Sequence, residues 1–145
     1  MPMGDLRAKA SRAASDCAAR RVDMFERLLA RTYDRTINRL DLDATMRSWA
    51  DDAVFEFPGQ TPISGRFEGK ATIRAWWKNV FDRASEVSFV PRHVAFANPF
   101  LLTLRNTMFT ELEVDSKTKD GLSAHAELVS VVRFRRGKAI HVSGG

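Results

Sequence analysis

Residues 49–77 read WADDAVFEFPGQTPISGRFEGKATIRAWW, and this stretch decides the fold. Its residue order predicts the end of a helix, a buried strand over residues 53–57, a loop over residues 58–68 and a new helix from about Lys70. Pro58 and Gly59 end the strand, since proline cannot donate a hydrogen bond to a strand ladder. A buried strand therefore lies between two helices along the chain.

The chain before this stretch predicts two helices. From about Asp16 to Leu40, apolar residues recur at steps of three and four, which indicates a helix with one buried stripe. Asp41 or Asp43 can cap a short second helix, because a carboxylate accepts the free amide hydrogens of a first turn. Residues 1–16 are mostly Ala, Arg and Ser, and we expect a flexible N-terminal arm there.

The chain after this stretch predicts one more helix and a run of strands. The helix spans residues 70–84, and strands follow over residues 87–97, 100–115, 122–135 and 138–143. Three helices followed by antiparallel strands predict an α+β fold, with the helices packed on one face of a curved antiparallel sheet. We expect a single domain over residues 17–145.

Composition narrows the class of protein. The chain has 145 residues, 44% of them hydrophobic, which suits one domain with a real core. No apolar run approaches the roughly 18 residues that a membrane helix needs, and no secretory leader is apparent, so we expect a cytoplasmic protein without a membrane partner. The single cysteine, Cys17, has no metal-ligand spacing, and no metal or organic cofactor is expected.

The net charge of +5 is concentrated near the N-terminus. Residues 1–40 hold nine Lys/Arg and five Asp/Glu, a balance of +4, and the remaining fourteen and thirteen give +1. A nucleic-acid surface more often combines a basic stripe with stacking aromatic side chains or a known motif. We therefore interpret the charges as a solvated helix face and expect no nucleic-acid partner.

The order W-A-D-D-A, then P, G-R and W-W, resembles the core of the nuclear transport factor 2-like superfamily. This superfamily includes ketosteroid isomerases, scytalone dehydratases, limonene epoxide hydrolases and SnoaL-type polyketide cyclases. The resemblance implies a cone-shaped fold around one deep apolar pocket, and often a homodimer. It does not imply one activity, because the chemistry of the members differs with the few polar residues of the pocket.

Position by position, the resemblance implies a few functional side chains. Tyr33 falls where ketosteroid isomerases have a tyrosine that donates to the substrate oxyanion, but Phe57 replaces their aspartate base. Ser130 stands at the position of their second oxyanion donor. An isomerase without its base cannot transfer the proton. The groups that epoxide hydrolases and cyclases require are also replaced, or fall where this chain ends.

The scytalone dehydratases fit this chain better. They use a Tyr-Asp pair at the end of the first helix, matched by Tyr33 and Asp34, and a histidine that is matched by His93. This implies Tyr33 as the hydrogen-bond donor, His93 as general acid or base, and Asp34 as the residue that orients His93. An Asp34–His93 hydrogen bond is the geometric condition. A core tyrosine, a solvent-facing aspartate and an ordinary strand histidine are the structural alternative.

We expect the pocket to hold a mostly apolar small molecule. Besides Tyr33, the expected lining is Phe55, Phe57, Phe81, Met108 and Ser130. The first hypothesis is a cofactor-independent cyclase, dehydratase or isomerase that works by acid–base chemistry. The alternative is a non-catalytic ligand-binding or structural dimerisation domain of the same fold. His93→Gln separates them, because a catalyst would lose turnover and a binder would not change.

Overall fold

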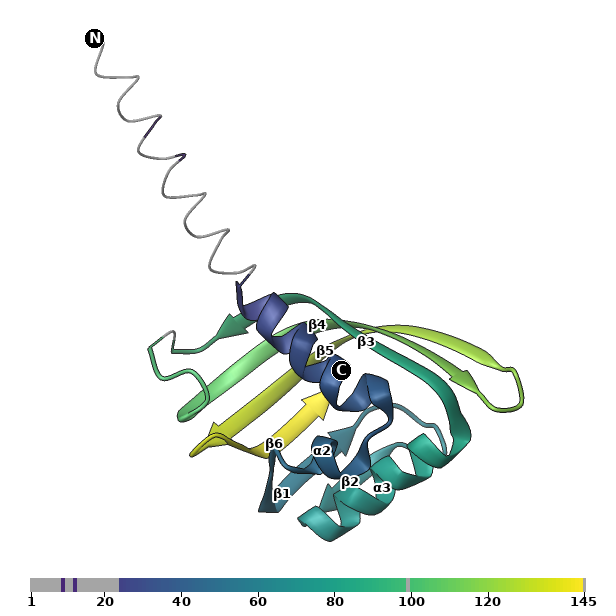
Figure 1. The fold of residues 1–145 in the computed structure, drawn as a ribbon. Coiled ribbons are helices and arrows are strands. Elements are labelled where there is room, and N and C mark those ends of the chain that lie inside the picture. The colour runs from purple at the N-terminus through teal and green to yellow at the C-terminus, as the bar shows by residue number, and fades with distance from the viewer. Residues whose placement is uncertain (1–8, 10–11, 13–23, 99, 145) are drawn as a thin grey trace.

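The structure, a computed structural model, describes residues 9, 12, 24–98 and 100–144 (Figure 1). The arm predicted over residues 1–16, and the predicted helix start near Asp16, therefore fall outside the described part of the chain, apart from Lys9 and Arg12. In the described part, no helix is long and apolar enough to cross a membrane.

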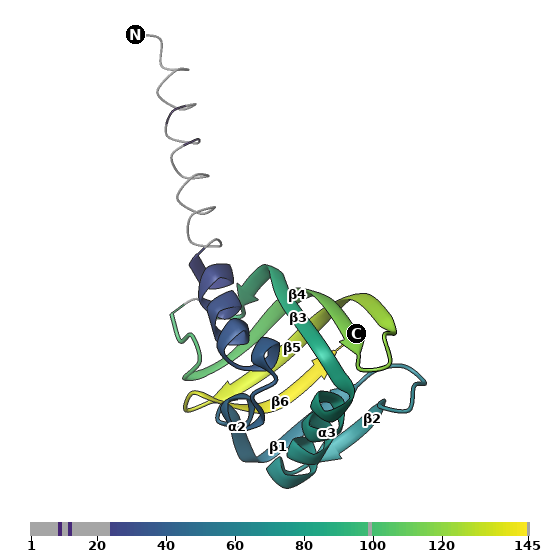
Figure 2. The same cartoon turned by 45° about the vertical axis from the view of Figure 1, so that its right-hand side comes forward.

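Six strands form one strongly curved sheet (Figure 2). They are β1 (Trp49–Phe57), β2 (Gly65–Glu68), β3 (Ala84–Phe96), β4 (Arg105–Thr118), β5 (Ser123–Arg135) and β6 (Lys138–Gly144), in the spatial order β2-β1-β6-β5-β4-β3. The expected sheet was antiparallel throughout. The β1–β6 pair is parallel and the others are antiparallel, so the sheet is mixed.

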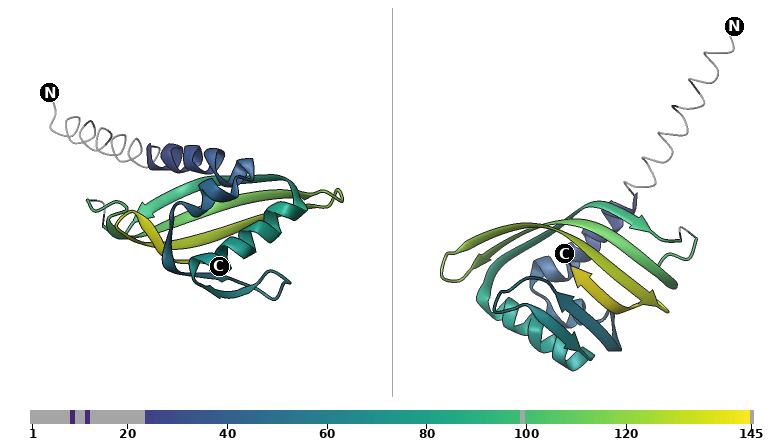
Figure 3. Two further views of the ribbon diagram at one scale, coloured as in Figure 1. Left: turned by 60° about the horizontal axis from the view of Figure 1, so that its bottom comes forward. Right: turned by 180° about the vertical axis from the view of Figure 1, so that it is seen from behind.

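Helices cover the concave face of this sheet (Figure 3). A helix over residues 24–35 runs across β3, a 3-10 turn η1 (Ile37–Arg39) and a short helix α2 (Leu42–Met46) follow, and α3 (Lys70–Arg83) packs beside β1. Asp41 caps α2, since its carboxylate accepts from the amide of Ala44 at 3.0 Å. The predicted α+β cone with three helices is therefore confirmed.

Several predicted boundaries shift. The first strand begins at Trp49, because the short helix ends at Met46 and does not reach Asp52. Residues 65–68, expected in a loop, form the edge strand β2. The long strand begins at Arg105 and not at residue 100, so residues 100–104 belong to a loop. Each difference lies where tertiary pairing, rather than local pattern, decides where a strand starts.

Aromatic side chains join α3 to β1 in the core. Phe55 has ring contacts with Trp49, Phe57, Phe67, Trp76 and Trp77, at centroid distances from 4.7 to 6.3 Å. Such ring pairs add to the stabilisation that burial alone supplies. Phe55 is therefore the centre of the packing that holds α3 against the sheet.

Two contacts hold the helix over residues 24–35 against the edge strand β3. The rings of Phe25 and Phe96 lie 5.1 Å apart, and those of Tyr33 and Phe89 lie 5.8 Å apart, both edge to face. Beyond the helix, the Asn38 side chain binds the β3 backbone: its Oδ1 accepts from the Phe89 amide at 2.8 Å, and its Nδ2 lies 3.4 Å from the Phe89 carbonyl. An amide side chain thereby pairs with a strand edge that has no further strand beside it.

Candidate functional site

A cavity of about 830 Å³ lies between the helices and the concave face of the sheet. Its lining comes from the helix over residues 24–35, from α3 and from the inner faces of five of the strands, and it is mostly aliphatic and aromatic. No carboxylate of the described residues lines it. An apolar cavity of this size, with a few polar groups, has the character of a small-molecule site.

Most residues expected in the pocket lie at this cavity. Phe55, Phe57, Met108 and Ser130 line it. Phe81 does not: its ring packs on Trp77 at 5.4 Å, one layer behind the lining. Phe81 follows Trp77 by four residues, so it lies on the same stripe of α3 but one turn further along the helix.

Tyr33 lines the cavity from the last turn of the helix over residues 24–35. Its hydroxyl makes no hydrogen bond with another described residue, and burial raises its pKa above the ordinary value. The phenol therefore stays protonated across the physiological range. It can offer a hydrogen bond to a ligand oxygen in a surrounding of low polarity.

The Asp34–His93 hydrogen bond that the dehydratase resemblance requires does not form among the described residues. The Asp34 side chain is exposed and accepts from Asn38 Nδ2 at 2.9 Å, which orients the amide that pairs with β3. His93 has a side chain that is 72% exposed, and its ring nitrogens lie 3.7 Å from Glu26 and 3.7 Å from Glu111. The structure gives neither residue a contact with the other within the described part of the chain.

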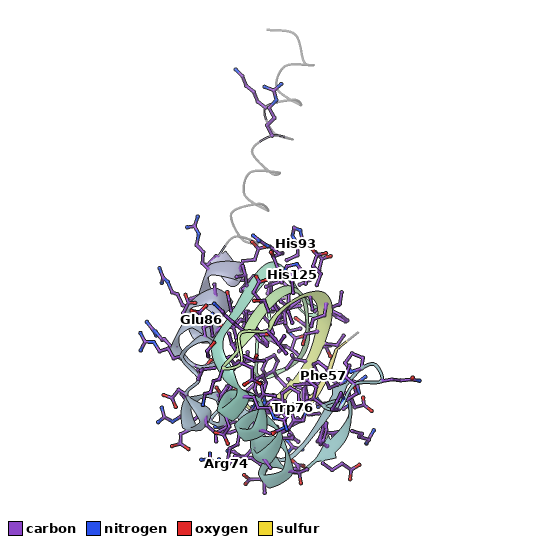
Figure 4. All side chains as sticks on the ribbon, turned by 90° about the vertical axis from the view of Figure 1, so that its right-hand side faces the viewer. Phe57, Arg74, Trp76, Glu86, His93 and His125 are labelled. Atoms are coloured by element: carbon purple, nitrogen blue, oxygen red, sulfur yellow. The ribbon has the colours of Figure 1, made fainter. Side chains whose placement is uncertain are left out.

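A β-bulge explains why His93 points outward. The register of β3 against β4 shifts between Pro91 and His93, so one extra residue is inserted there. An extra residue exchanges the two faces of a strand. Before the bulge Phe89 lines the cavity, after it Val94 and Phe96 do, and His93 falls on the other side. In Figure 4 the labelled His93 lies at the upper end of the sheet, well away from Phe57 and Trp76 beside α3.

Two buried polar groups near the cavity have no partner, and the sequence analysis missed both. The Thr110 hydroxyl is unpaired although the residue is 1% exposed, and Trp77, which lines the cavity, has an unpaired Nε1. Thr110 pairs with Ser130 across β4 and β5, so their side chains share the inner face. The alternation that places Met108 inward also includes Thr110, so the pattern could have identified it. Nothing in the sequence marks the Trp77 indole as unpaired.

The outer face of β4 and β5 carries a second cluster. Glu113, Asp115 and His125 offer ligand atoms within 4.8 Å of one another, a spacing that could hold a metal ion. The groups already bind other side chains: Asp115 lies 2.6 Å from His125 Nδ1, and Glu113 accepts from Arg92. Asp115 raises the pKa of His125 by hydrogen bonding and by its charge. His125 also borders the cavity, between Ala124 and Ala126, while its Nδ1 is bound to Asp115.

A third polar group lies on the outer face of β1 and β6. His141 Nε2 is 3.1 Å from Glu56 Oε2, and Arg66 Nη1 binds Glu56 Oε1 at 3.0 Å. The other ring nitrogen of His141, Nδ1, is buried without a partner. The network binds β2 and β6 to the two sides of β1.

Three comparisons place this architecture among known proteins. The model of the SnoaL-like domain matches residues 29–142. A search of curated proteins finds no match.

Solved structures share the fold at low sequence identity. An NTF2-like protein of unknown function from Burkholderia pseudomallei aligns with a TM-score of 0.64 and 19% identity, covering 79% of this chain and 83% of its own. A Mycobacterium tuberculosis protein in complex with estradiol-17β-hemisuccinate gives 0.65 and 15%, over 82% and 91%. A Catenulispora acidiphila protein with a ketosteroid isomerase-like fold, in complex with trimethylamine, gives 0.58 and 12%, over 72% and 73%. At these identities the likeness is one of fold.

Proposed function

The chain belongs to the SnoaL-like domain family, and from this premise we propose that it binds a mostly apolar small molecule in the cavity under its helices. The observation that carries the proposal is the combination of an apolar lining with unpartnered polar groups. Tyr33 has a neutral, unbonded hydroxyl at the cavity, and Trp77, which also lines it, has a buried indole nitrogen without a partner. Buried polar groups without partners are costly, so a ligand that supplies the missing bonds would be favoured.

The ligand that fits this arrangement has an apolar body and one or two oxygen atoms. Rings of Phe55, Phe57 and Trp76 form one wall, which suits an aromatic or polycyclic body. The Tyr33 hydroxyl would donate to one ligand oxygen, and Ser130 could exchange a hydrogen bond with another. The M. tuberculosis protein of the same fold is known in complex with a steroid ester, which supports a ligand of this class.

Binding of a steroid probe tests the proposal. Isothermal titration calorimetry with estradiol-17β-hemisuccinate compares the wild type with Tyr33→Phe, which keeps the ring and removes only the hydroxyl. We expect Tyr33→Phe to weaken binding by about 2- to 10-fold, the usual effect of one neutral hydrogen bond. His93→Gln is the matched control and should bind as the wild type does. Equal affinity for wild type and Tyr33→Phe would contradict the role given to Tyr33.

Catalysis of the cyclase, dehydratase or isomerase type is a second candidate function. The placement of Tyr33 favours it, because a half-buried neutral phenol at the cavity can stabilise an oxyanion that develops in a transition state. Asp34 and His93 would supply the acid–base step in this candidate, as the dehydratase resemblance implies. The exposed position of His93 and the lack of a carboxylate in the described lining weigh toward binding without turnover. His93→Gln decides: a large loss of turnover with unchanged ligand affinity supports the catalyst.

Self-association is the third part of the proposal, and the outer face of the sheet is the surface for it. Phe109, 43% exposed, lies directly opposite Val131 on β5, with Val129 beside it. Charges of both signs surround this apolar strip, including Arg92, Glu111 and Arg133. A two-fold interface pairs a surface with itself, so a strip rimmed by both signs can be self-complementary. Phe109→Asp should then lower the mass in light scattering from dimer to monomer.

A further inference from the structure

The β3–β4 loop, which contributes two residues to the cavity lining, carries an exposed apolar cluster. Phe100 is 88% exposed and Leu104 is 60% exposed, and Leu101 and Leu102 lie between them in the same loop. Leu102 and Thr103 line the cavity, as does the half-exposed Leu28 on the facing helix. Contiguous exposed apolar side chains at the rim of a cavity indicate an interaction surface.

The loop holds these side chains in a defined position. The Asn106 side chain binds both the amide and the carbonyl of Asn98 at the base of the loop, and the Leu104 amide binds the Leu101 carbonyl. The amides of Arg136 and Gly137 bind the Leu104 and Thr103 carbonyls, which fastens the loop to the β5–β6 turn. The two connections lie together on the left of Figure 1.

The backbone conformation of one leucine is a second observation that points to a binding role for this loop. Leu102 has a φ of 46°, which a branched side chain rarely adopts. Strain of this kind persists only where surrounding structure imposes it, and it concentrates at binding sites. Here the surrounding bonds hold an apolar side chain at the cavity rim.

The charges around this cluster are mostly positive. Five cationic side chains lie at the same end of the cone. Arg47 follows α2 and Arg105 begins β4. The β5–β6 turn carries Arg135, Arg136 and Lys138. The acids nearby on β1 are Asp51 and Asp52, and Asp52 is bound to Arg135 at 2.9 Å. Arg47, Arg105, Arg136 and Lys138 form no ion pair with another described residue, so their charges are available to a partner.

From this apolar cluster and its cationic rim we propose that the protein docks its cavity mouth on an anionic phospholipid surface. Phe100, Leu101 and Leu104 would enter the boundary between headgroups and acyl chains, and the arginines would bind lipid phosphates. A second copy fits this surface poorly, because a two-fold axis would bring the cationic rims against each other. Docking there would open the cavity toward the bilayer, where apolar molecules collect. The sequence predicted no membrane partner on the ground that no segment spans; a surface that only lies on a bilayer has no such requirement.

Vesicle co-sedimentation tests this docking. Wild-type protein is mixed with phosphatidylcholine vesicles, with and without phosphatidylglycerol. We expect binding only to vesicles that contain phosphatidylglycerol, and release of the protein as salt concentration rises. Phe100→Ser with Leu101→Ser should lower the partition coefficient by at least about tenfold, since the inserted apolar area is lost. Leu122→Ser is the matched control, a 70% exposed leucine at the β4–β5 hairpin, and should bind as the wild type does.

A charge variant and a mass measurement complete the test. Arg47→Gln with Arg105→Gln should reduce binding to the anionic vesicles and make the remainder less steeply dependent on salt, because three of the five cations are left. A wild type that stays in the supernatant with phosphatidylglycerol vesicles would overturn the proposal, as would an equal loss in Leu122→Ser. If light scattering shows that Phe100→Ser with Leu101→Ser turns a dimer into a monomer, a second copy covers the cluster and the proposal is wrong. Because vesicle binding needs no steroid, its failure leaves the proposed ligand site standing.

Discussion

The inner and outer faces of β4 and β5 belong to the same two strands, but they differ in whether their polar side chains have hydrogen-bond partners. On the inner face, Thr110 is buried without a hydrogen-bond partner and Ser130 lines the cavity. On the outer face, Glu113 binds Arg92 and Asp115 binds His125. Folding alone satisfies the outer groups and leaves the inner ones open. Ser130 lines the cavity, so a ligand there could bond its hydroxyl, whereas the unpaired Thr110 hydroxyl lies behind the lining and is a cost to the fold.

The largest expected difference between the faces concerns packing. Phe55→Ala should lower the free energy of unfolding by about 3–5 kcal/mol, because Phe55 is buried and contacts five other aromatic rings. Phe109→Ala on the outer face should cost about 1 kcal/mol or less. Urea denaturation, at a concentration that keeps the protein monomeric, measures both. Similar losses for the two variants would show that the inner face is not the core.

Removing a satisfied polar group should have the next largest effect. Asn38→Ala leaves the Phe89 amide of β3 without its partner, and we expect a loss of about 1–3 kcal/mol. The same urea experiment measures it. Asp34→Ala is the milder comparison, since Asp34 only orients the Asn38 amide from an exposed position. A larger loss for Asp34→Ala than for Asn38→Ala would contradict this order.

Removing an unsatisfied polar group should change the free energy of unfolding in the opposite direction. Thr110→Val keeps the shape and deletes a buried hydroxyl without a partner, so the free energy of unfolding should rise by about 1 kcal/mol. Thr107→Val, at a position of opposite parity on β4, should change it by less than about 0.5 kcal/mol. A clear loss of stability in Thr110→Val would mean that its hydroxyl is bonded after all.

The smallest expected effect is the pH dependence of the outer face. Asp115 raises the pKa of His125 above its unfolded value, so the folded state binds the proton more tightly. The resulting stabilisation is fully present below the ordinary histidine pKa and is lost as pH rises through the raised value. An NMR titration of His125 should show the pKa fall in Asp115→Asn. An unchanged His125 pKa in that variant would contradict the role of Asp115 in raising it.

Local pattern predicted the parts of the site that depend on a single helix or an undistorted strand. The 3.6-residue period placed Tyr33 on the buried stripe, and the two-residue period of β4 and β5 placed Met108 and Ser130 on one face. The fold class followed from the element order and from the resemblance carried by residues 49–77.

Local sequence pattern could not predict the features that depend on how strands pair with one another. The bulge after Pro91 reverses the faces of β3, which turns His93 outward. A proline inside a strand fits an edge strand as well as a bulge, so it does not decide which face His93 takes. The parallel β1–β6 pair and the short strand β2 likewise depend on contacts between distant parts of the chain. The unpaired Trp77 indole is a property of the assembled core, so only the structure reveals it.

One measurement tests the ligand cavity most directly: native mass spectrometry of the wild type and of Ser130→Phe. Both are incubated with a panel of steroids and polycyclic phenols, and a matching urea transition shows that the variant folds. The account predicts that the wild type retains at least one probe at one molecule per chain and that Ser130→Phe, whose new ring occupies the cavity, retains none. A wild type that binds no probe, or a variant that binds as well as the wild type, would contradict it.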